Sequence, residues 1–579
     1  MNEISSRHPA VETVKRLEKK REKILTLSAE QALKEILNSE NPVELVQSFS
    51  EQDFYFLIHD VGLEDCLPLL SLASNQQWEY IVDAESWAKD RIEMKSLTRW
   101  LNHLLNASPE QFIQWFLTEK TDLIELYLYR NIDLRIREHD QDPSDFNETF
   151  FTQDNVFYIR IPEADYISEN DDSIRTCRRE FIQHFIDRLA AHDHIVYQNV
   201  LMEISGILPV ETEEEAYRLR NVRLAEKGFL PFEDAVGVYQ GCRPEAVGRL
   251  GKKADSFSET VGSDSVGRYP IKLLERDNLF AEALTRITAD DVLNQIQSEF
   301  AGLCNRLISA DQSPIRYREQ LQKIVRKACG YINIGIQCLA GDLSATPDPV
   351  FNASLIKTYP LVQLFRVGYG AAANIKRKAE QWRKHAWFLK QGLPLGFWDE
   401  LGMGVLGGLF LKRPLFFDNY NTGVLYREFA SMTDIQATET ILNDITAMDD
   451  LFSRFELTYR PTAETFVTFK TLLLTLWART VEGLSEEFSP IPLPCFRQFY
   501  RKLFDEDASS ISGPRLTRLP MKESILNWMS EKSGLGIEDI SQRSGRLLEE
   551  LFHEIELEYG EVSEKNLDPR FIQLFLVSK

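Results

Sequence analysis

The stretch that decides the fold class is SLTRWLNHLLNASPEQFIQWF, residues 96–116. Its first half carries large apolar residues at Leu97, Trp100, Leu101, Leu104 and Leu105. This i, i+3, i+4, i+7, i+8 spacing places them on one side of an α-helix, with polar residues on the other. We therefore expect a helix here that is packed along one side.

The tetrapeptide SPEQ that follows, residues 108–111, has the composition of a helix start. A serine can accept from an unsatisfied backbone N–H, the residue three places on can reach back, and a first-turn proline sacrifices no hydrogen bond. Similar starts stand at SEQD, residues 50–53, and SNQQ, residues 74–77, and each opens a short apolar run. Residues 41–130 are therefore expected to form several short amphipathic helices.

The fold class predicted from this pattern is all-α, with stacked helical hairpins in a superhelical or irregular array. One short hairpin cannot bury its apolar side alone, so neighbours must cover it. An ordinary irregular helical domain is the alternative. We also expect one or two small β-hairpins, the first near 149–161 around an Asp-Asn turn and the second joining 414–417 to 424–426.

Four segments are expected along the chain. Residues 1–30 form a charged N-terminal helix, and 31–247 form a helical-repeat-like domain that includes the first hairpin. Residues 248–269 are rich in Gly, Ser and charge, which is typical of a flexible linker or a mobile loop. Residues 270–579 form a C-terminal helical domain.

Composition limits the class of protein. The chain has 579 residues, 43% of them hydrophobic, which is enough for a large core and excludes intrinsic disorder. Its net charge of −23 repels phosphate backbones, so we do not expect the surface as a whole to bind nucleic acid. No apolar run approaches the roughly 20 residues of a membrane span. The seven cysteines are scattered without a C-x-x-C pair, so we expect a reducing, cytoplasmic location.

Several strings resemble one family. They are SEQDFYFLIHDVGLEDCLPLLSLAS (50–74), the hairpin NVFYIRIPE, GFLPFEDAVGVY (228–239) and LFRVGYG (364–370). They are similar to an uncharacterised bacterial family of large helical proteins, a domain of unknown function, over nearly the whole chain. The N-terminal part also resembles the helical-repeat cytosolic domain of MgtE-type magnesium transporters, which implies a regulatory or interaction module. These strings carry packing and capping residues, so no ligand or catalytic role is transferred.

Ile58-His59-Asp60-Val61-Gly62 is similar to the metal-binding His-Asp heart of HD-type phosphohydrolases. Imidazole and carboxylate together suit a divalent metal that generates hydroxide. That family also needs further histidines and a distal aspartate, which the spacing here does not supply. On a helical wheel His59 lies about 140–150° from the neighbouring apolar stripe. We therefore expect a surface histidine and keep a metal site at His59 and Asp60 as an alternative.

Four further motifs are incomplete, so we assign no catalytic residue and no cofactor. A Glu-x-x-His lacks its second copy, a histidine group lacks ligand support, a G-x-G-x-x-G lacks its βαβ context, and an S-x-x-K lacks its companions. The motifs lie at Glu550 and His553; at His184, His192 and His194 with Asp187 and Asp193; at Gly402, Gly404 and Gly407; and at Ser354 and Lys357.

The outstanding charge anomaly is a predicted basic amphipathic helix over 374–391, opposed only by Glu380. Such a helix binds an anionic ligand, a nucleic-acid backbone, a membrane surface or an acidic partner, or it pairs with acidic neighbours of its own chain. The candidate binding residues are Lys376, Arg377, Lys378, Arg383 and Lys384.

The function expected from the sequence is that of a cytoplasmic interaction or scaffold protein, whose partner is another protein. Two alternatives remain, an HD-type phosphohydrolase centred on His59 and Asp60, and an anion, nucleic-acid or membrane binder that uses residues 374–391. The sequence leaves the partner, any catalytic activity and the oligomeric state open.

Overall fold

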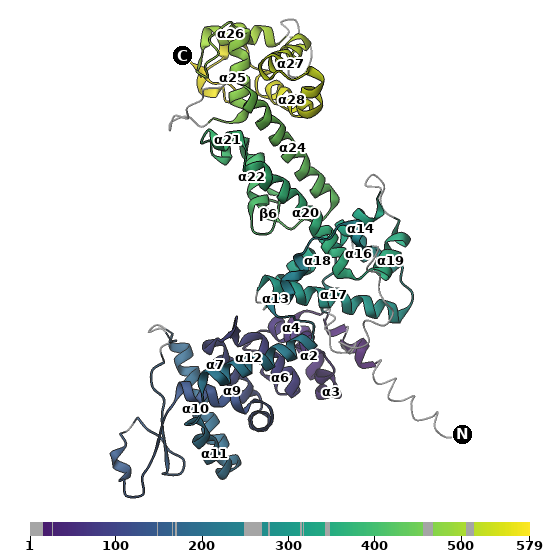
Figure 1. Ribbon diagram of the computed structural model, residues 1–579. Helices are drawn as coiled ribbons and strands as arrows, with labels where there is room; N and C mark the ends of the chain where they lie inside the picture. Colours follow the sequence, from purple (N-terminus) through teal and green to yellow (C-terminus); the bar gives the residue numbers. More distant parts are fainter. Residues whose placement is uncertain are drawn as a thin grey trace, which may run out of the picture. The chain divides into compact units, whose positions relative to one another are not determined.

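A computed structural model describes most of the chain (Figure 1). The described residues are 16–21, 23–25, 27–147, 149–164, 166–167, 171–247, 269–275, 278–312, 315, 318–341, 348–455, 467–504 and 515–579. They divide into two compact units. Unit 1 comprises Met1–Ile332 and Ala345–Arg366, and unit 2 comprises Asn333–Ser344 and Val367–Lys579. This division lies elsewhere than the linker predicted at 248–269; most of that segment is outside the described residues, so the linker stays a prediction.

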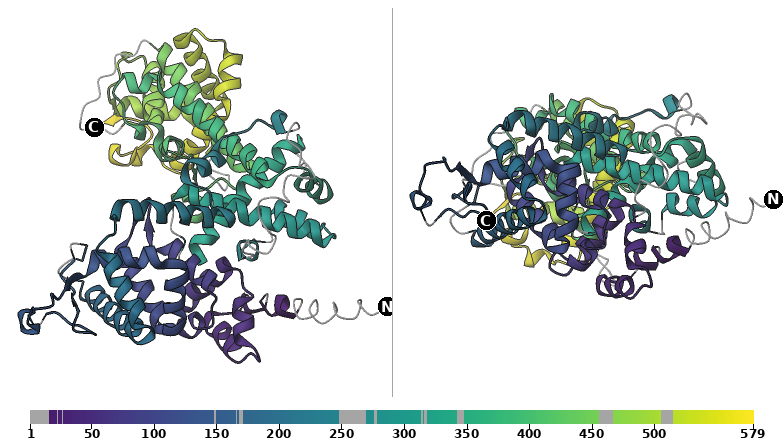
Figure 2. Two further views of the ribbon diagram at one scale, coloured as in Figure 1. Left: turned by 60° about the horizontal axis from the view of Figure 1, so that its bottom comes forward. Right: turned by 90° about the horizontal axis from the view of Figure 1, so that it is seen from below.

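The fold is all-α, as the sequence predicted, and short helices form the first part of unit 1 (Figure 1). Helix α4 packs on α6, which is close to it in sequence, whereas α7 packs on α10 and α9 on α12 across long intervening segments. Figure 2 shows the helices of this part of the chain, coloured purple to blue, side by side. The bounds are α2 (Ala29–Leu37), α3 (Pro42–Gln47), α4 (Glu51–Val61), α5 (Leu67–Leu70), α6 (Asn75–Glu85), α7 (Met94–Ala107), α8 (Pro109–Trp115), α9 (Thr121–Asn131), α10 (Asp172–His192), α11 (His194–Ile204) and α12 (Pro209–Glu226). Within the N-terminal segment, residues 16–21 and 23–25 are helical.

The helix starts largely follow the expected capping chemistry. The Ser50 hydroxyl accepts from the Asp53 N–H at 3.1 Å. Ser74 and Gln77 form a reciprocal capping box at the start of α6. Ser108 makes no side-chain cap, although Pro109 does stand in the first turn of α8. The apolar stripe of α7 is buried as its spacing requires.

A π-helical turn, Phe116–Lys120, joins α8 to α9 and was not expected from the sequence. It brings Lys120, whose side chain is 5% exposed, to 2.8 Å from Glu79 and 3.8 Å from Asp83. Arg223 of α12 also donates to both oxygens of Asp83, at 2.7 and 2.9 Å. These charges tie α6, the π-helical turn and α12 together.

Two small antiparallel sheets interrupt the helices of unit 1. β1 (Trp87–Ala88) pairs with β2 (Arg91–Ile92), and β3 (Asp133–Ile136) pairs with β4 (Phe157–Arg160). The expected hairpin near 149–161 therefore takes a different form. Its second strand pairs mainly with β3, and only Phe151 bridges back to Ile159. The turn between them places Asn155 in the left-handed region, at φ 54°.

Unit 1 continues with further helices, and two of its long helices, α18 and α20, contribute residues to both units. The bounds are α13 (Phe232–Ala235), α14 (Pro244–Val247), α15 (Tyr269–Lys272), α16 (Leu279–Thr285), α17 (Asp290–Asp311), α18 (Arg318–Ala340), α19 (Pro349–Thr358) and α20 (Leu361–Arg383).

Unit 2 is a second helical body, in which α24 packs against α21, α22, α27 and α28. The hairpin predicted around 419–423 is confirmed, because β5 (Phe416–Phe417) pairs with β6 (Tyr426–Arg427). A parallel pair, β7 (Ile491–Pro492) with β8 (Val577–Ser578), was not expected. The helices are α21 (Trp387–Lys390), α22 (Asp399–Phe410), α23 (Asn419–Thr422), α24 (Met432–Arg454), α25 (Phe469–Val481), α26 (Leu493–Leu503), α27 (Leu519–Ser533) and α28 (Ile537–Tyr559). None of the described helices of either unit combines the length and apolar character needed to cross a bilayer.

Candidate binding pocket

A cavity of about 770 Å³ lies in unit 1 where three helix ends meet. One wall is formed by the end of α4 and the turn that follows it, with His59, Glu64 and Asp65. The end of α6 adds Glu85, and the face of α7 forms the opposite wall. The volume is within the range of small-ligand sites, and polar side chains from separate elements line the cavity.

Local sequence explains how the first wall is built. Helix α4 ends at Gly62, whose φ of 96° is a conformation that a residue with a Cβ adopts only under strain. The Gly62 N–H donates to the Ile58 carbonyl at 3.0 Å, and the chain then leaves the helix axis. Glu64 and Asp65 are consequently presented at the cavity and remain exposed.

His59 is not the surface histidine that the sequence predicted, because its side chain is only 7% exposed. Its ring lies edge-on to Tyr55, with 4.4 Å between centroids, and 5.9 Å from the Trp100 ring. The helical wheel places His59 away from the apolar stripe correctly, but Glu85 at the end of α6 and Trp100 of α7 lie against it on this second side of α4. The expectation failed because the apolar periodicity of a helix gives only the angle of each residue around its axis. It does not show how many other helices pack against that helix.

Glu85 is the buried carboxylate of the cavity. The Tyr55 hydroxyl lies 2.5 Å from Glu85 Oε1 and 3.0 Å from the Ile315 carbonyl oxygen, so it holds the carboxylate in place. His59 Nε2 lies 3.3 Å from the same Oε1 atom. This imidazole nitrogen nevertheless has no hydrogen-bond partner among the described residues. A buried polar atom in this state is costly unless water or a ligand satisfies it.

The α7 wall carries a basic ladder, which we define as Lys95, Arg99 and His103, spaced four residues apart on one face. Lys95 forms an ion pair with Asp171 at 3.1 Å, and Arg99 is exposed. Burial, aided by the Arg99 charge, lowers the pKa of His103, so its imidazole is neutral at neutral pH. At neutral pH the positive charges of the basic ladder are therefore those of Lys95 and Arg99.

The metal-site alternative finds no ligand set in the part of the chain that the structure describes. No group of three or more His, Cys, Asp or Glu side chains is placed to hold a metal ion there. The surroundings of His59 are a tyrosine, a tryptophan and a single close carboxylate. A hydrolytic metal centre usually needs at least three protein ligands and an open position.

The incomplete histidine and glutamate motifs do not converge. Glu550 pairs with Arg546 on its own helix, and His553 is exposed. His184 and His192 are exposed on α10, while Asp193 accepts from the first N–H groups of α11 at 2.8 and 3.1 Å. Asp193 therefore caps a helix, and the other residues of these motifs lie on helix surfaces.

The glycine motif of α22 permits close packing. A Cβ on Gly404 would lie 2.4 Å from the Phe417 ring, and one on Gly407 would lie 2.4 Å from the Tyr426 hydroxyl. One on Gly402 would lie 2.9 Å from Trp398. Because Gly404 and Gly407 have no side chain, the β5–β6 hairpin packs directly against α22. This packing explains the glycine motif without a nucleotide phosphate.

The basic segment is not one continuous helix, since α20 ends at Arg383 and α21 begins at Trp387. The break is fixed by Asp449 of α24, whose carboxylate accepts from the Trp382 indole and from the N–H groups of Trp387 and Phe388, at 2.9 to 3.0 Å. Burial raises the pKa of this carboxyl, and the three donors oppose the shift.

Two lysines of this segment make their polar contacts with acceptors inside unit 2. Lys376 Nζ donates to the carbonyls of Leu409 and Leu411 at the end of α22, at 3.2 and 2.7 Å, and pairs with Glu380 at 2.8 Å. Lys378 pairs with Glu439 at 2.5 Å.

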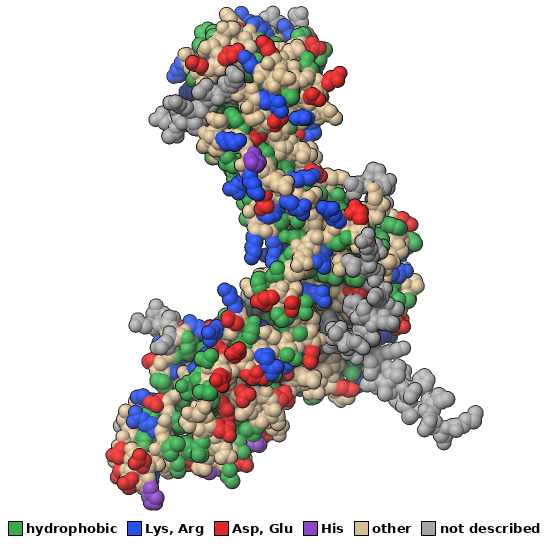
Figure 3. Space-filling model, in the orientation of Figure 1, with side chains coloured by type: hydrophobic (Ala, Val, Ile, Leu, Met, Phe, Trp, Pro, Cys, Tyr) green, Lys and Arg blue, Asp and Glu red, His purple; other side chains and the backbone are tan. Residues whose placement is uncertain are grey.

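The other candidate cations stay on the surface. The Arg383 guanidinium lies over the Phe410 ring, 4.6 Å from its centroid. Among the described residues Arg377 donates a hydrogen bond only to Asn374, at 3.4 Å, and Lys384 is exposed. Figure 3 shows Lys and Arg side chains gathered over the part of unit 2 that holds α20, α21 and the β5–β6 hairpin.

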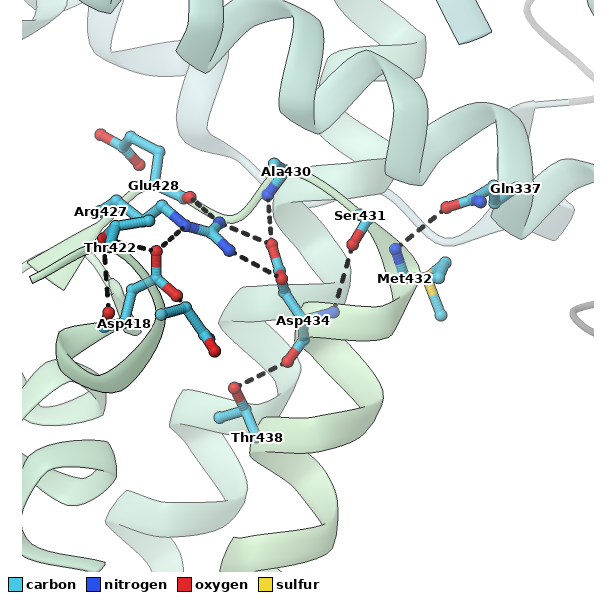
Figure 4. Close-up of polar contacts among 11 residues, drawn as sticks. Gln337, Asp418, Thr422, Arg427, Glu428, Ala430, Ser431, Met432, Asp434 and Thr438 are labelled. Atoms are coloured by element: carbon cyan, nitrogen blue, oxygen red, sulfur yellow. Dashed lines mark hydrogen bonds and ion pairs between the residues drawn. The ribbon is translucent and has the colours of Figure 1, made fainter. Parts of the chain in front are cut away.

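A buried ion cluster beside this surface is internally satisfied (Figure 4). Arg427 donates to Asp418 at 2.7 Å and to both oxygens of Asp434 at 2.8 and 3.0 Å. Asp434 also accepts from the Ala430 N–H at 2.8 Å, and Asp418 accepts from Thr422 at 2.9 Å. Hydrogen bonds therefore occupy the carboxylates, and the cluster fixes the β5–β6 hairpin to the start of α24.

The described residues thus define an all-α protein of packed helix pairs, with a polar cavity in unit 1 and a basic surface on unit 2. Residues 9–578 match the sequence model of one family, whose description reads "Family of unknown function (DUF6178)". The chain belongs to this family. No curated protein and no solved structure matches the chain.

Proposed function

We propose that this is an interaction protein that binds an acidic segment of a partner protein through its basic face. The basic face is defined as Lys376, Arg377, Arg383, Lys384, Lys390 and Lys412. Long side chains connect its elements, because Lys376 reaches the carbonyl of Leu411 and Arg383 covers Phe410. A scaffold role in the cytoplasm, as the sequence suggests, fits this proposal.

The observation that carries the proposal is a group of exposed cations without ion pairs among the described residues of an acidic chain. Lys384, Lys390 and Lys412 are exposed and make no ion pair with any described residue. The whole chain nevertheless has a net charge of −23, so carboxylates are abundant. Cations that remain unpaired on such a surface are available to a partner of complementary charge.

A short acidic segment suits this face better than a polyanionic surface does. The negative field of the whole protein opposes approach to a membrane or to nucleic acid, where many charges act together. A short peptide is small enough that the positive potential of the basic face, rather than the negative field of the whole protein, dominates its binding. Apolar side chains also stand here, with Leu389 41% exposed and Leu411 40% exposed, and a protein partner can cover them.

The resemblance of the N-terminal part to MgtE-type cytosolic domains supports the same class of function. Such domains are regulatory modules, and the all-α fold of unit 1 is compatible with a module of that kind. The resemblance offers no catalytic residue, so it adds support for binding without assigning a reaction.

The experiment is titration of a fluorescently labelled oligo-glutamate peptide into the full-length protein at low and at high salt. The test variant carries Lys384→Glu, Lys390→Glu and Lys412→Glu. We expect it to bind at least about tenfold more weakly, since three exposed charge contacts at up to about 1 kcal/mol each are reversed. Binding by the wild type should also weaken as salt increases.

A matched control has the same change in net charge at exposed lysines elsewhere, Lys323→Glu, Lys357→Glu and Lys565→Glu. It should bind as the wild type does. Equal losses in both triple variants would contradict the proposal. Tighter binding to heparin or to phosphatidylglycerol vesicles than to the peptide would also contradict it.

A further inference from the structure

The cavity of unit 1 has walls of opposite charge. The wall formed by α4, its following turn and the end of α6 carries Glu64, Asp65 and Glu85. The α7 wall carries the cations Lys95 and Arg99, and the Glu93 carboxylate at its start is engaged in capping the helix. We propose that this cavity binds a dipolar ligand with an ammonium group and a carboxylate, such as an amino acid or a short peptide. This site is separate from the basic face, so the inference does not rest on the proposed function.

The acidic wall has a fixed anchor for the ammonium group. Glu85 is 6% exposed and is held by the Tyr55 hydroxyl at 2.5 Å, so its carboxylate is already oriented. Preorganised groups bind a charge at low reorganisation cost. Glu64 and Asp65 lie nearer to solvent and extend the negative wall outward.

The basic wall supplies the anion contact. Lys95 is shared with Asp171, whereas Arg99 makes no ion pair with any described residue. A guanidinium matches a carboxylate with two parallel hydrogen bonds. The Glu93 carboxylate already accepts from the Ser96 N–H at 2.6 Å, so the start of α7 is capped by its own chain. The ligand carboxylate is therefore expected at Arg99 and not at the helix end.

The buried imidazole of His59 indicates that the cavity is built for a polar ligand. His59 lines the cavity, and its side chain is 7% exposed. Its buried Nε2 lies 3.3 Å from Glu85 Oε1 but has no hydrogen-bond partner among the described residues. A ligand N–H or carbonyl can satisfy it. The Trp100 ring beside it offers an apolar surface to the carbon skeleton.

A ligand with one charge fits less well. An anion alone would bring its charge close to Glu64 and Glu85, and an amine alone would lie beside Arg99. Each would bring like charges together in a partly enclosed space, where they are weakly screened. Only a dipolar ligand places opposite charges against both walls.

The test uses full-length protein and probes of matched size. The dipolar probes are γ-aminobutyrate, 5-aminovalerate and triglycine, and the singly charged controls are butylamine and butyrate. Binding is measured by calorimetry. We expect at least one dipolar probe to bind about tenfold or more tightly than either control. Failure of every dipolar probe to exceed butylamine and butyrate would overturn the inference.

Variants locate the binding. Arg99→Ala should abolish the preference for the dipolar probe, and because Arg99 is exposed, its loss should leave the fold intact. Glu85→Gln should weaken the same probe, with circular dichroism to confirm folding. Arg188→Ala, which removes an exposed arginine of α10, should bind as the wild type does. A preference that survives in Arg99→Ala would place binding elsewhere and refute the site.

Discussion

Replacing Glu125 with glutamine should make the stability of unit 1 less dependent on pH. Glu125 on α9 is 6% exposed and its Oε1 has no hydrogen-bond partner among the described residues. Burial, the largest cause, together with the neighbouring carboxylates of Glu203 on α11 and Asp122 on α9, raises its pKa to about 8. The folded protein therefore keeps a proton at neutral pH that the unfolded chain has released.

The sign and size of the effect follow from proton linkage. Between the ordinary pKa of 4.5 and the folded value of about 8, the folded state binds up to one more proton than the unfolded state. Stability is therefore highest at low pH in this window and falls as pH rises, by at most about 1.4 kcal/mol per pH unit. The whole window corresponds to at most about 5 kcal/mol. We expect about half of that, because the exposed Glu203 can move away.

The assay is thermal unfolding of the wild type and Glu125→Gln from pH 5 to pH 9, with hydrogen exchange of α9 to report on unit 1. Above pH 7 the variant should become more stable to thermal unfolding than the wild type, relative to their difference at pH 5. Glu180→Gln, at an exposed position of α10, is the matched control and should follow the wild type. Parallel pH curves for the wild type and Glu125→Gln would refute the reasoning.

Three further predictions concern packing, buried charge and capping. Gly404→Ala should lower the stability of unit 2 by about 1–3 kcal/mol, because its Cβ would collide with the Phe417 ring; an unchanged melting curve would contradict this. Arg427→Met should cost about 3–5 kcal/mol in chemical denaturation, because it leaves Asp418 and Asp434 without their cation; a loss under 1 kcal/mol would show that the cluster is dispensable. Ser74→Ala should cost about 1 kcal/mol by removing the cap of α6, and Ser74→Asp should restore it; equal stability of all three proteins would count against the capping box.

The local parts of the fold could be predicted from the sequence because short-range chemistry determines them. The stripe of α7 and the capping box at Ser74 each depend on residues within a few turns. The β5–β6 hairpin likewise joins strands that are close in the chain. The G-x-G-x-x-G of α22, which lacks a βαβ context in the sequence, lies where Phe417 and Tyr426 of the β5–β6 hairpin pack closely on the helix.

The long-range parts could not be predicted in this way. Strand β4 pairs with β3 across an intervening segment, and only Phe151 makes the local bridge that the sequence favoured. The break after Arg383 depends on Asp449, which comes from a different helix. His59 is buried because residues of two other helices, Glu85 of α6 and Trp100 of α7, lie against it. In each case the deciding contact is absent from the local pattern.

Hydrogen exchange with and without an oligo-glutamate peptide tests the central claim, that the basic face receives an acidic partner, most directly. The account predicts added protection in α20 after residue 373, in α21 and in residues 410–413, with the remainder of the described chain unchanged. Protection spread evenly over the protein, or confined to unit 1, would contradict it.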